Sequence, residues 1–259
     1  MSLGQHVGQK ILVVGAGGIG TATVEHLVTE DARVVVAGRN VRMDGPFDDP
    51  KDELGIVLGH LTVDITDDGA VEWGVSRAAE ILGGLDALVV TAGHRHELAP
   101  LHETQAGWAR EIIETELIGV MSLVRHSLPF LRNAGNKGRR AGIVVVASDS
   151  AKAGSMGDAA SSAARSGVLG MVKSVARENA AVPLTVNAVC PGPTDTEMYR
   201  QAAESEGMTG KVFSGMAKGI PARRLGQPEE IAATVAFLLS EGSAYITGQA
   251  LSVSGGLTM

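Results

Sequence analysis

The apolar residues of this chain are concentrated in short runs of five to eight residues. Runs of this length and composition are typical of strands that are buried on both faces of a parallel sheet. Polar and glycine-rich segments separate these runs and limit their length. We therefore predict strands at Lys10–Val14, Arg33–Ala37, Ile56–Val63, Leu85–Val90, Ile143–Ala147 and Leu184–Cys190.

Segments with helical patterns lie between most of the predicted strands. Asp67 is placed to cap one of them, and Pro129 is placed to kink or end another. The alternation of strands and helices predicts one doubly wound α/β domain over residues 1–259, with right-handed crossovers. The expected helices run from the glycine-rich turn to about Glu30, over Ala70–Leu82, over 104–134, from about Asp158 to 180, and up to Ser240.

The length, charge and cysteine content of the chain exclude several classes of protein. The chain has 259 residues, of which 44% are hydrophobic, so it is long enough to bury the core of one large domain. Its net charge of −7 argues against a nucleic-acid partner. Its apolar runs are too short to cross a membrane, and it begins without a secretory leader. Cys190 is the single cysteine, so no intrachain disulfide forms, and we expect a cytoplasmic location.

A glycine-rich turn joins the first predicted strand to the first predicted helix. Gly15, Gly17 and Gly20 form the pattern G-x-G-x-x-G, and the run from Arg33 to Ala37 completes a βαβ unit. In a Rossmann-type fold this turn lets the backbone approach a pyrophosphate, which rests on helix N–H groups. The alternative is a glycine turn that binds no ligand. We favour dinucleotide binding because the motif lies between a strand and a helix.

The segment Gly142–Ala180 combines a buried strand, a turn rich in Ser, Gly and Ala, and a helix. Together with the glycine turn, Pro191–Thr196 and Arg223–Glu230, it resembles the short-chain dehydrogenase/reductase family over nearly the whole chain. The resemblance implies seven parallel strands in the order 3-2-1-4-5-6-7 and a substrate lid at about 194–221. It also implies a homodimer or homotetramer that associates through the helices at 104–134 and 158–180, whose small residues permit close contact.

The resemblance also assigns residues to a nicotinamide dinucleotide. The glycine turn has one residue fewer than the family pattern, because two residues rather than three separate Gly15 from Gly18. Thr91 replaces the Asn of the family's Asn-Ala-Gly motif. The implied cofactor-binding residues are Gly15, Gly17, Gly18, Ile19, Gly20, Arg39, Asp64, Ile65, Thr91, Ala92, Gly93, Arg165, Pro191, Gly192, Thr194 and Thr196.

The residues after the second strand bear on the choice of cofactor. An acidic residue at this position accepts hydrogen bonds from a ribose 2′-OH, whereas an arginine pairs with a 2′-phosphate. Arg39, with Arg42 nearby, therefore favours NADP(H) over NAD(H). The alternative is that Arg39 is a solvated loop residue. The following segment, Met43–Gly55, contains two prolines and is expected to be a loop.

The catalytic positions are where the chain departs from the family. Members of the family have a Ser at the strand end, a Tyr thirteen residues later, a Lys four residues after the Tyr, and an Asn on the preceding helix. By register these positions hold Ser148, Ser161, Arg165 and Glu116. A serine hydroxyl is a poor acid/base group near neutral pH, and a guanidinium does not readily give up a proton. We expect impaired or altered hydride-transfer chemistry, with Tyr199 the plausible substitute for the missing phenol.

Two further features leave alternatives open. Glu116 and Arg165 face each other if the family geometry holds, and they would then offset each other's charge. Alternatively, Arg165 packs as a long helix residue with a solvated head. His94, Arg95, His96 and Glu97 crowd the loop after the fourth strand, but two histidines at i, i+2 without a strong third ligand indicate a polar loop rather than a metal site.

Three functions remain open on these grounds. The first is an enzyme of this family that uses NADP(H) on a small carbonyl or acyl substrate. The second is a nucleotide-binding pseudoenzyme, and the third is a lyase or isomerase without redox turnover. The ending Ser252–Met259 resembles that of dehydrogenases acting on alicyclic acyl-CoA thioesters, which favours a small-molecule substrate. The fold alone does not separate these functions.

Overall fold

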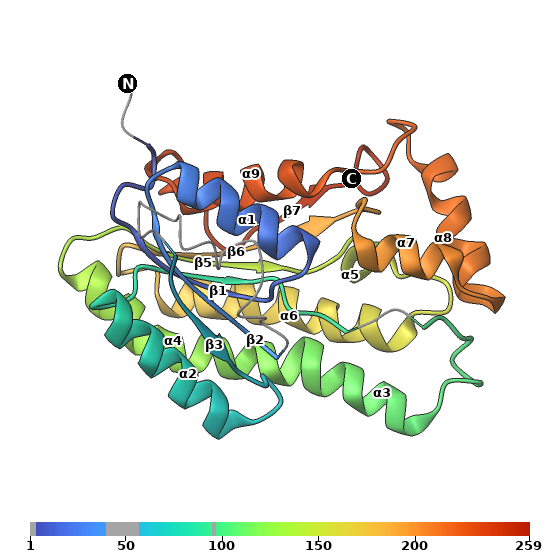
Figure 1. The fold of residues 1–259 in the computed structure, drawn as a ribbon, viewed down its shortest axis with the longest axis horizontal. Coiled ribbons are helices and arrows are strands. Elements are labelled where there is room, and N and C mark those ends of the chain that lie inside the picture. The colour runs from blue at the N-terminus through green and yellow to red at the C-terminus, as the bar shows by residue number, and fades with distance from the viewer. Residues whose placement is uncertain (1–3, 40–56, 95–96) are drawn as a thin grey trace.

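The computed structural model describes residues 4–39, 57–94 and 97–259, which form a sheet of seven parallel strands. The strand order is β3-β2-β1-β4-β5-β6-β7, as predicted (Figure 1). The order reverses between β1 and β4, and ligands bind at such a switch point in open α/β sheets. The strands are β1 (Lys10–Val14), β2 (Arg33–Gly38), β3 (Val57–Thr62), β4 (Ala87–Val90), β5 (Ala141–Val146), β6 (Leu184–Pro191) and β7 (Ala250–Val253).

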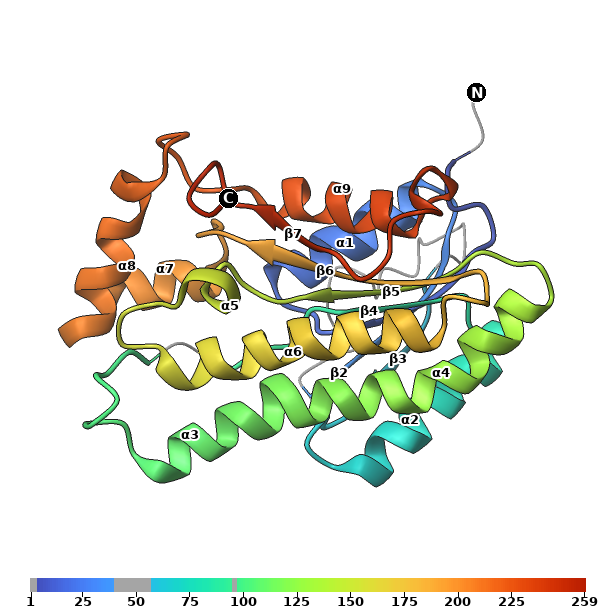
Figure 2. The ribbon, with the colours of Figure 1, turned by 180° about the vertical axis from the view of Figure 1, so that it is seen from behind.

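Helices cover both faces of the sheet, with α1 and α9 on one face and α2, α4 and α6 on the other (Figures 1 and 2). A π-helical turn, η1 (Glu114–Gly119), and a 3₁₀ turn, η2 (Glu241–Ser243), complete the elements. The helices are α1 (Gly18–Thr29), α2 (Asp68–Leu82), α3 (Ala106–Ile113), α4 (Val120–Asn136), α5 (Ser150–Ala153), α6 (Ala159–Glu178), α7 (Glu197–Glu204), α8 (Gly207–Gly219) and α9 (Pro228–Leu239).

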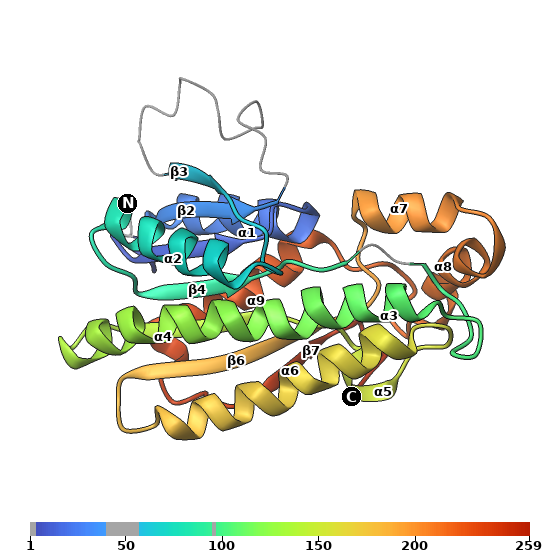
Figure 3. The same ribbon diagram turned by 90° about the horizontal axis from the view of Figure 1, so that it is seen from below.

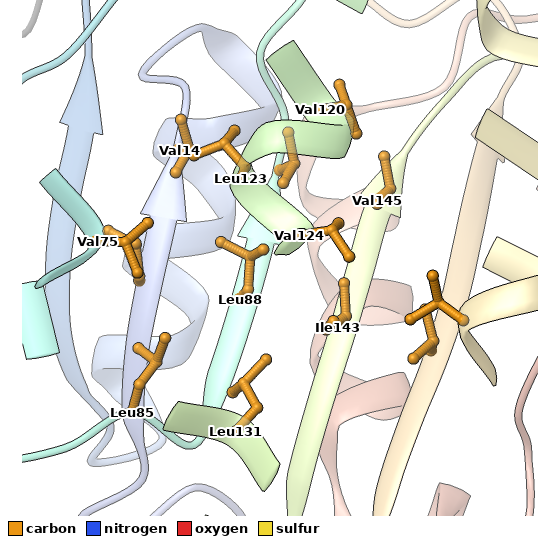
Figure 4. Packing of buried hydrophobic residues seen from close by; sticks show 14 of the residues in the cluster. Val14, Val75, Leu85, Leu88, Val120, Leu123, Val124, Leu131, Ile143 and Val145 are labelled. Atoms are coloured by element: carbon orange, nitrogen blue, oxygen red, sulfur yellow. The ribbon is translucent and has the colours of Figure 1, made fainter. Parts of the chain in front are cut away.

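The central strands β1, β4 and β5 are almost entirely apolar because alternate residues enter two different cores. Leu12 and Val14 of β1 belong to the cluster under α2, α4 and α6, part of which is shown in Figure 4. Ile11 and Val13 belong to the cluster under α1 and α9. A strand that is buried on both faces favours apolar side chains at every position, which explains the nearly continuous runs in the sequence.

The long helix predicted over 104–134 is one run of three parts, α3, η1 and α4, which continue into one another (Figure 3). Pro129 lies inside α4, so of the two expectations for this residue, a kink or an end of the helix, the end is wrong. The irregularity is instead the π-helical turn, which contains Glu116. Such turns insert an extra residue into a helix and are frequent at functional sites.

The expected lid, 194–221, contains two helices, although its sequence shows no clear helical periodicity. Both α7 and α8 pack on Leu98, forming a small cluster that includes Ala202 and Phe213.

The start of helix α2 has the cap that the sequence predicts. The Asp67 side chain accepts a hydrogen bond from the Ala70 N–H at 3.0 Å, as expected. Arg42, Met43–Gly55, Arg95 and His96 lie outside the described residues.

Within the part of the chain that the structure describes, no helix is long and apolar enough to span a membrane. Nor do the described His, Cys, Asp and Glu side chains form a group of three or more that could hold a metal ion.

Candidate active site

A cavity of about 1170 Å³ lies at the carboxyl ends of the strands, between the switch point and the lid. Pockets for small ligands usually measure about 300–1,000 Å³, so this cavity has room for a dinucleotide together with a substrate. Every residue that the resemblance assigns to the cofactor, from Gly15 to Thr196, lines its wall. Of the four predicted catalytic residues, Ser148 and Arg165 line the cavity, whereas Ser161 and Glu116 lie buried behind its wall.

The glycine turn is built for close contact between backbone segments. A Cβ at Gly20 would lie 2.0 Å from the Gly15 carbonyl oxygen, and Gly15 itself has a φ of 114°. Thr91 supports this turn, since its hydroxyl donates to the Gly15 carbonyl at 2.9 Å. Gly17 precedes α1 and provides no side-chain cap, which leaves the first N–H groups of the helix available to an anion.

Arg39 and Asp64 lie on the cavity wall beyond the glycine turn. Asp64 accepts hydrogen bonds from the backbone N–H and the hydroxyl of Thr66, at 3.0 and 2.8 Å. These bonds, together with the charge of Arg39, hold the pKa of Asp64 below its usual value. The Arg39 side chain is exposed and makes no hydrogen bond or ion pair with another described residue. It is therefore available to an anionic group of a ligand.

Glu116 occupies the centre of a buried hydrogen-bond network. Its Oε1 accepts from Arg165 at 2.6 Å and from the His94 backbone N–H at 3.0 Å. Its Oε2 accepts from Ser161 at 2.6 Å and from Arg165 Nε at 2.9 Å. Burial raises the pKa of Glu116, but Arg165, Ser161 and the His94 N–H outweigh this effect and lower it. The carboxylate is thus charged, paired and fully occupied as an acceptor.

Arg165 joins this network to the strand that carries Ser148. Its guanidinium forms a two-pronged pair with Glu116 and donates through Nη1 to the Ala147 carbonyl at 2.6 Å. Gly93 makes room for the pair, since a Cβ there would lie 2.9 Å from Arg165 Nη2. The structure therefore shows that Glu116 and Arg165 are paired, and that the Arg165 head is not a solvated surface group.

Ser148 is oriented for contact with a ligand. Its oxygen accepts from the backbone N–H and the hydroxyl of Ser150, at 3.1 and 3.0 Å. A hydroxyl that accepts two hydrogen bonds still has its own proton to donate. Because Ser148 lines the cavity, that proton is available to an oxygen atom of a bound substrate.

Tyr199, the expected substitute for a missing phenol, is engaged within the lid. Its hydroxyl donates to the Phe213 carbonyl at 2.6 Å, and the two rings pack 5.4 Å apart. Burial raises the pKa of Tyr199, and the charge of Asp195 adds to the shift. The geometry thus gives Tyr199 a role in holding α7 against α8 rather than in proton exchange.

Asp158 lines the cavity beside this network, and the sequence analysis did not assign it to the site. It precedes α6 by one residue and does not cap it with its side chain. Burial, and then the charge of Glu116, raise the pKa of Asp158 to about 6, although Arg165 and Ser161 oppose the shift. The sequence signal was weak, because an Asp before a helix is ordinarily interpreted as an N-cap.

Comparison with known proteins supports the interpretation from geometry. The family model described as enoyl-(acyl carrier protein) reductase matches residues 14–258. The chain is 34% identical to cis-4-hydroxycyclohexanecarboxylate dehydrogenase of Sinomonas cyclohexanicum, over 99% of each chain. It is 35% identical to the 3-oxoacyl-(acyl-carrier-protein) reductase FabG of Vibrio cholerae, over 97% of this chain and 98% of that one. The chain belongs to the short-chain dehydrogenase/reductase family.

Solved structures of this family superpose on the chain over its full length. A short-chain dehydrogenase/reductase of Brucella melitensis matches with a TM-score of 0.87 and 27% identity, and covers all of both chains. A 3-ketoacyl-(acyl-carrier-protein) reductase of the same organism, complexed with NADH, matches with a TM-score of 0.83 and 27% identity, again over both full chains. The family assignment and the single-domain Rossmann fold are therefore established.

The buried pair predicts a large and mutually dependent effect on stability. Glu116→Gln or Arg165→Met alone should each cost about 3–5 kcal/mol, because either change leaves a buried charge or donor without its partner. The double variant should cost less than the sum of the two. Urea denaturation of the four proteins measures this coupling. Because the pKa of Glu116 is lowered, the coupling should be present above its ordinary value of 4.5 and should disappear as the pH falls through the lowered value.

The control is the exposed pair Arg77–Glu80, whose side chains are 47% and 71% exposed. The matched changes Arg77→Met and Glu80→Gln should cost about 0–1 kcal/mol each. An equally small cost at Glu116 and Arg165 would contradict the role that we assign to the buried pair.

Proposed function

We propose that this protein binds NADP(H) and a small carbonyl or acyl substrate, and that it transfers hydride through a site with altered acid/base chemistry. The observation that carries the proposal is the cavity, whose wall combines the glycine turn, Arg39 and Ser148. The nicotinamide, when bound, supplies or accepts the hydride. The chain's own residues orient the two ligands and exchange the proton.

The backbone around the glycine turn fits a dinucleotide because side chains are excluded where a pyrophosphate would lie. A Cβ at Gly18 would lie 2.9 Å from the Thr196 side chain, which also lines the cavity. The uncapped start of α1 provides N–H donors and a favourable helix dipole for the phosphates. Arg39 supports a 2′-phosphate, and hence NADP(H), although the related Brucella structure was complexed with NADH.

The substrate end of the cavity is apolar and is formed largely by the lid. Leu98, Met156, Met198, Val212 and Met216 line it, and the Ser148 hydroxyl lines the same cavity. Methionine side chains adapt to irregular apolar shapes. A compact apolar ring or acyl chain with one carbonyl suits this environment, in keeping with the cyclohexanecarboxylate and 3-oxoacyl relatives.

The altered chemistry follows from the network around Glu116. By the family register, Ser161 and Arg165 stand where relatives have a Tyr and a Lys. Ser161 donates to Glu116, and each nitrogen of Arg165 already donates to a protein oxygen. Neither is free to act as the family's proton donor. This supports slow or altered carbonyl reduction, and it keeps a non-redox lyase or isomerase as the second candidate.

The first test combines the purified protein, NADPH and a panel of alicyclic ketones and 3-oxoacyl thioesters. Nucleotide absorbance and product mass should change together if hydride is transferred. A mass change without nucleotide consumption would select the lyase or isomerase. If NADPH neither binds nor reacts, the nucleotide-dependent function is wrong.

Restoring the family residues should raise reductase activity at neutral pH. Ser161→Tyr with Arg165→Lys and Glu116→Asn replaces the ion pair by a phenol that a lysine can activate. Because general acid catalysis commonly contributes about 10²–10⁴-fold, turnover should rise by up to that factor. The control is the double variant that retains Glu116. Its carboxylate should form an ion pair with the new lysine and so hold the lysine away from the new tyrosine. Turnover by the parent that equals that of the triple variant would contradict the altered-site proposal.

Calorimetric titration tests the choice of nucleotide. The parent should bind NADPH more tightly than NADH, because Arg39 provides a charge for the 2′-phosphate. Arg39→Ala should remove most of that preference and leave NADH affinity nearly unchanged. Arg33→Ala, at the opposite end of β2 and exposed, is the matched control and should preserve the preference. Equal affinities in the parent would end the NADP(H) proposal.

We also propose self-association through the outer faces of η1, α4 and α6. Ile118 and Met121 are 47% and 45% exposed on this surface. The small residues expected to permit close contact between helices are Ala159, Ala160, Ala163, Ala164 and Gly167. Of these, Ala159 and Ala163 are exposed, whereas Ala164 is buried within the chain. Light scattering should show a dimer or tetramer at micromolar concentration, and Ile118→Lys with Met121→Lys should shift it toward monomer. A monomeric parent would overturn this proposal.

A further inference from the structure

Besides Ser148, three carboxyl groups and the Ser161 hydroxyl lie at this part of the cavity or behind its wall, and they differ in how far they are exposed to it. Glu116 accepts four hydrogen bonds and lies behind the wall. Ser161 is 4% exposed and donates to Glu116. Asp149 lines the cavity, but it is 6% exposed and both of its carboxyl oxygens are buried. Glu116 and Ser161 do not line the cavity, and the Asp149 oxygens are not exposed in it.

We propose that Asp158 is the catalytic residue that exchanges a proton with the substrate. The inference rests on the proposed function and deepens it. Asp158 is half-buried, lines the cavity that Ser148 also lines, and lies in the turn that enters α6. Its carboxyl group is the member of this cluster that combines access to the cavity with contact to the buried network.

The surroundings of Asp158 explain why its proton is available near neutral pH. Burial disfavours the carboxylate, and the negative charge of Glu116 adds to this effect, so its pKa is raised to about 6. Arg165 and the Ser161 hydroxyl oppose the shift from α6. Two apolar side chains, Leu98 and Met208, lie against this turn at Gly157. A carboxyl group with this pKa can act as an acid or as a base close to physiological pH.

The buried ion pair has a positioning role in this scheme. Ser161 lies between the two carboxyl groups, because its hydroxyl donates to Glu116 and also interacts with Asp158. Glu116 stays charged because Arg165 pairs with it, and this fixed negative charge favours the protonated form of Asp158. Replacing the family's phenol by Ser161 therefore moves the ionisable group three residues along the chain rather than removing it.

The proton balance is simple. In reduction, the O–H bond of the Asp158 carboxyl breaks and a new O–H bond forms at the substrate carbonyl oxygen, while the reduced nicotinamide provides the hydride for the carbonyl carbon. Asp158 becomes a carboxylate and is protonated again by water in the cavity. In oxidation, the Asp158 carboxylate takes the hydroxyl proton. Reduction should thus slow as the pH rises through about 6, whereas oxidation should slow as the pH falls through that value.

The test uses the full-length protein with NADPH and the most reactive ketone of the panel. The parent's reductive kcat should fall about tenfold per pH unit above pH 6, because the protonated fraction falls by that factor. Asp158→Asn should lower kcat by about a hundredfold or more and flatten the profile, with unchanged NADPH affinity. Asp158→Glu should recover part of the rate. Glu114→Gln, which removes an exposed charge from the same π-helical turn as Glu116, should leave rate and profile unchanged.

A direct titration provides the readout that does not depend on turnover. Carbon-13 NMR of protein labelled at its aspartate carboxyls should show one resonance that titrates near pH 6 and that is absent from Asp158→Asn. A parent that reduces the ketone while Asp158→Asn retains its rate and pH profile, or an Asp158 resonance that titrates near 3.8, would overturn the Asp158 proposal alone. A parent that neither binds NADPH nor consumes it would overturn the proposed function, and the Asp158 proposal with it.

Discussion

The ion pair between Glu116 and Arg165 holds the functional end of this protein together. It joins the π-helical turn, the start of α6, the loop after β4 through the His94 N–H, and the end of β5 through the Ala147 carbonyl. Burying two opposite charges is tolerable only when the hydrogen-bonding groups on both are satisfied, and here Glu116 accepts four hydrogen bonds. Four segments that are distant in sequence are therefore fixed relative to one another by one polar contact.

This pair also determines what the surrounding groups do. Because Arg165 neutralises Glu116 at close range, Glu116 remains ionised despite its burial. The charge of Glu116 nevertheless raises the pKa of Asp158. The Asp158 carboxyl lies nearer the cavity and forms no comparable ion pair among the described residues. Two acidic side chains in one site thus have their pKa values shifted in opposite directions. Such a separation is the usual way in which a site obtains one permanent charge and one exchangeable proton.

The fold was predictable because its signals are local and repeated. Most buried strands are apolar runs, since both of their faces enter a core, and Gly15 and Gly20 lie where two backbone segments approach each other closely. The lid was less predictable, because α7 and α8 bury only a few residues against Leu98 and need no strong periodicity. A π-helical turn interrupts the long helix at Glu114–Gly119, and the sequence analysis did not predict it. The sequence of this turn has no proline, and its one glycine is the last residue, so nothing in it signals an irregularity as Pro129 does.

The sequence predicted which residues lie near one another in the site, but not which of them line the cavity. Sequence register brought Ser148, Ser161, Arg165 and Glu116 together, yet it did not show which of them face the cavity. That distinction depends on depth: Gly93 has no side chain, so Arg165 can lie in the cavity wall and pair with Glu116, which is buried behind it. A larger residue at 93 would occupy the position of the guanidinium. Glu116, Arg165 and Gly93 therefore act as a single structural unit, and Asp158 is an acidic side chain beside this unit that lines the cavity.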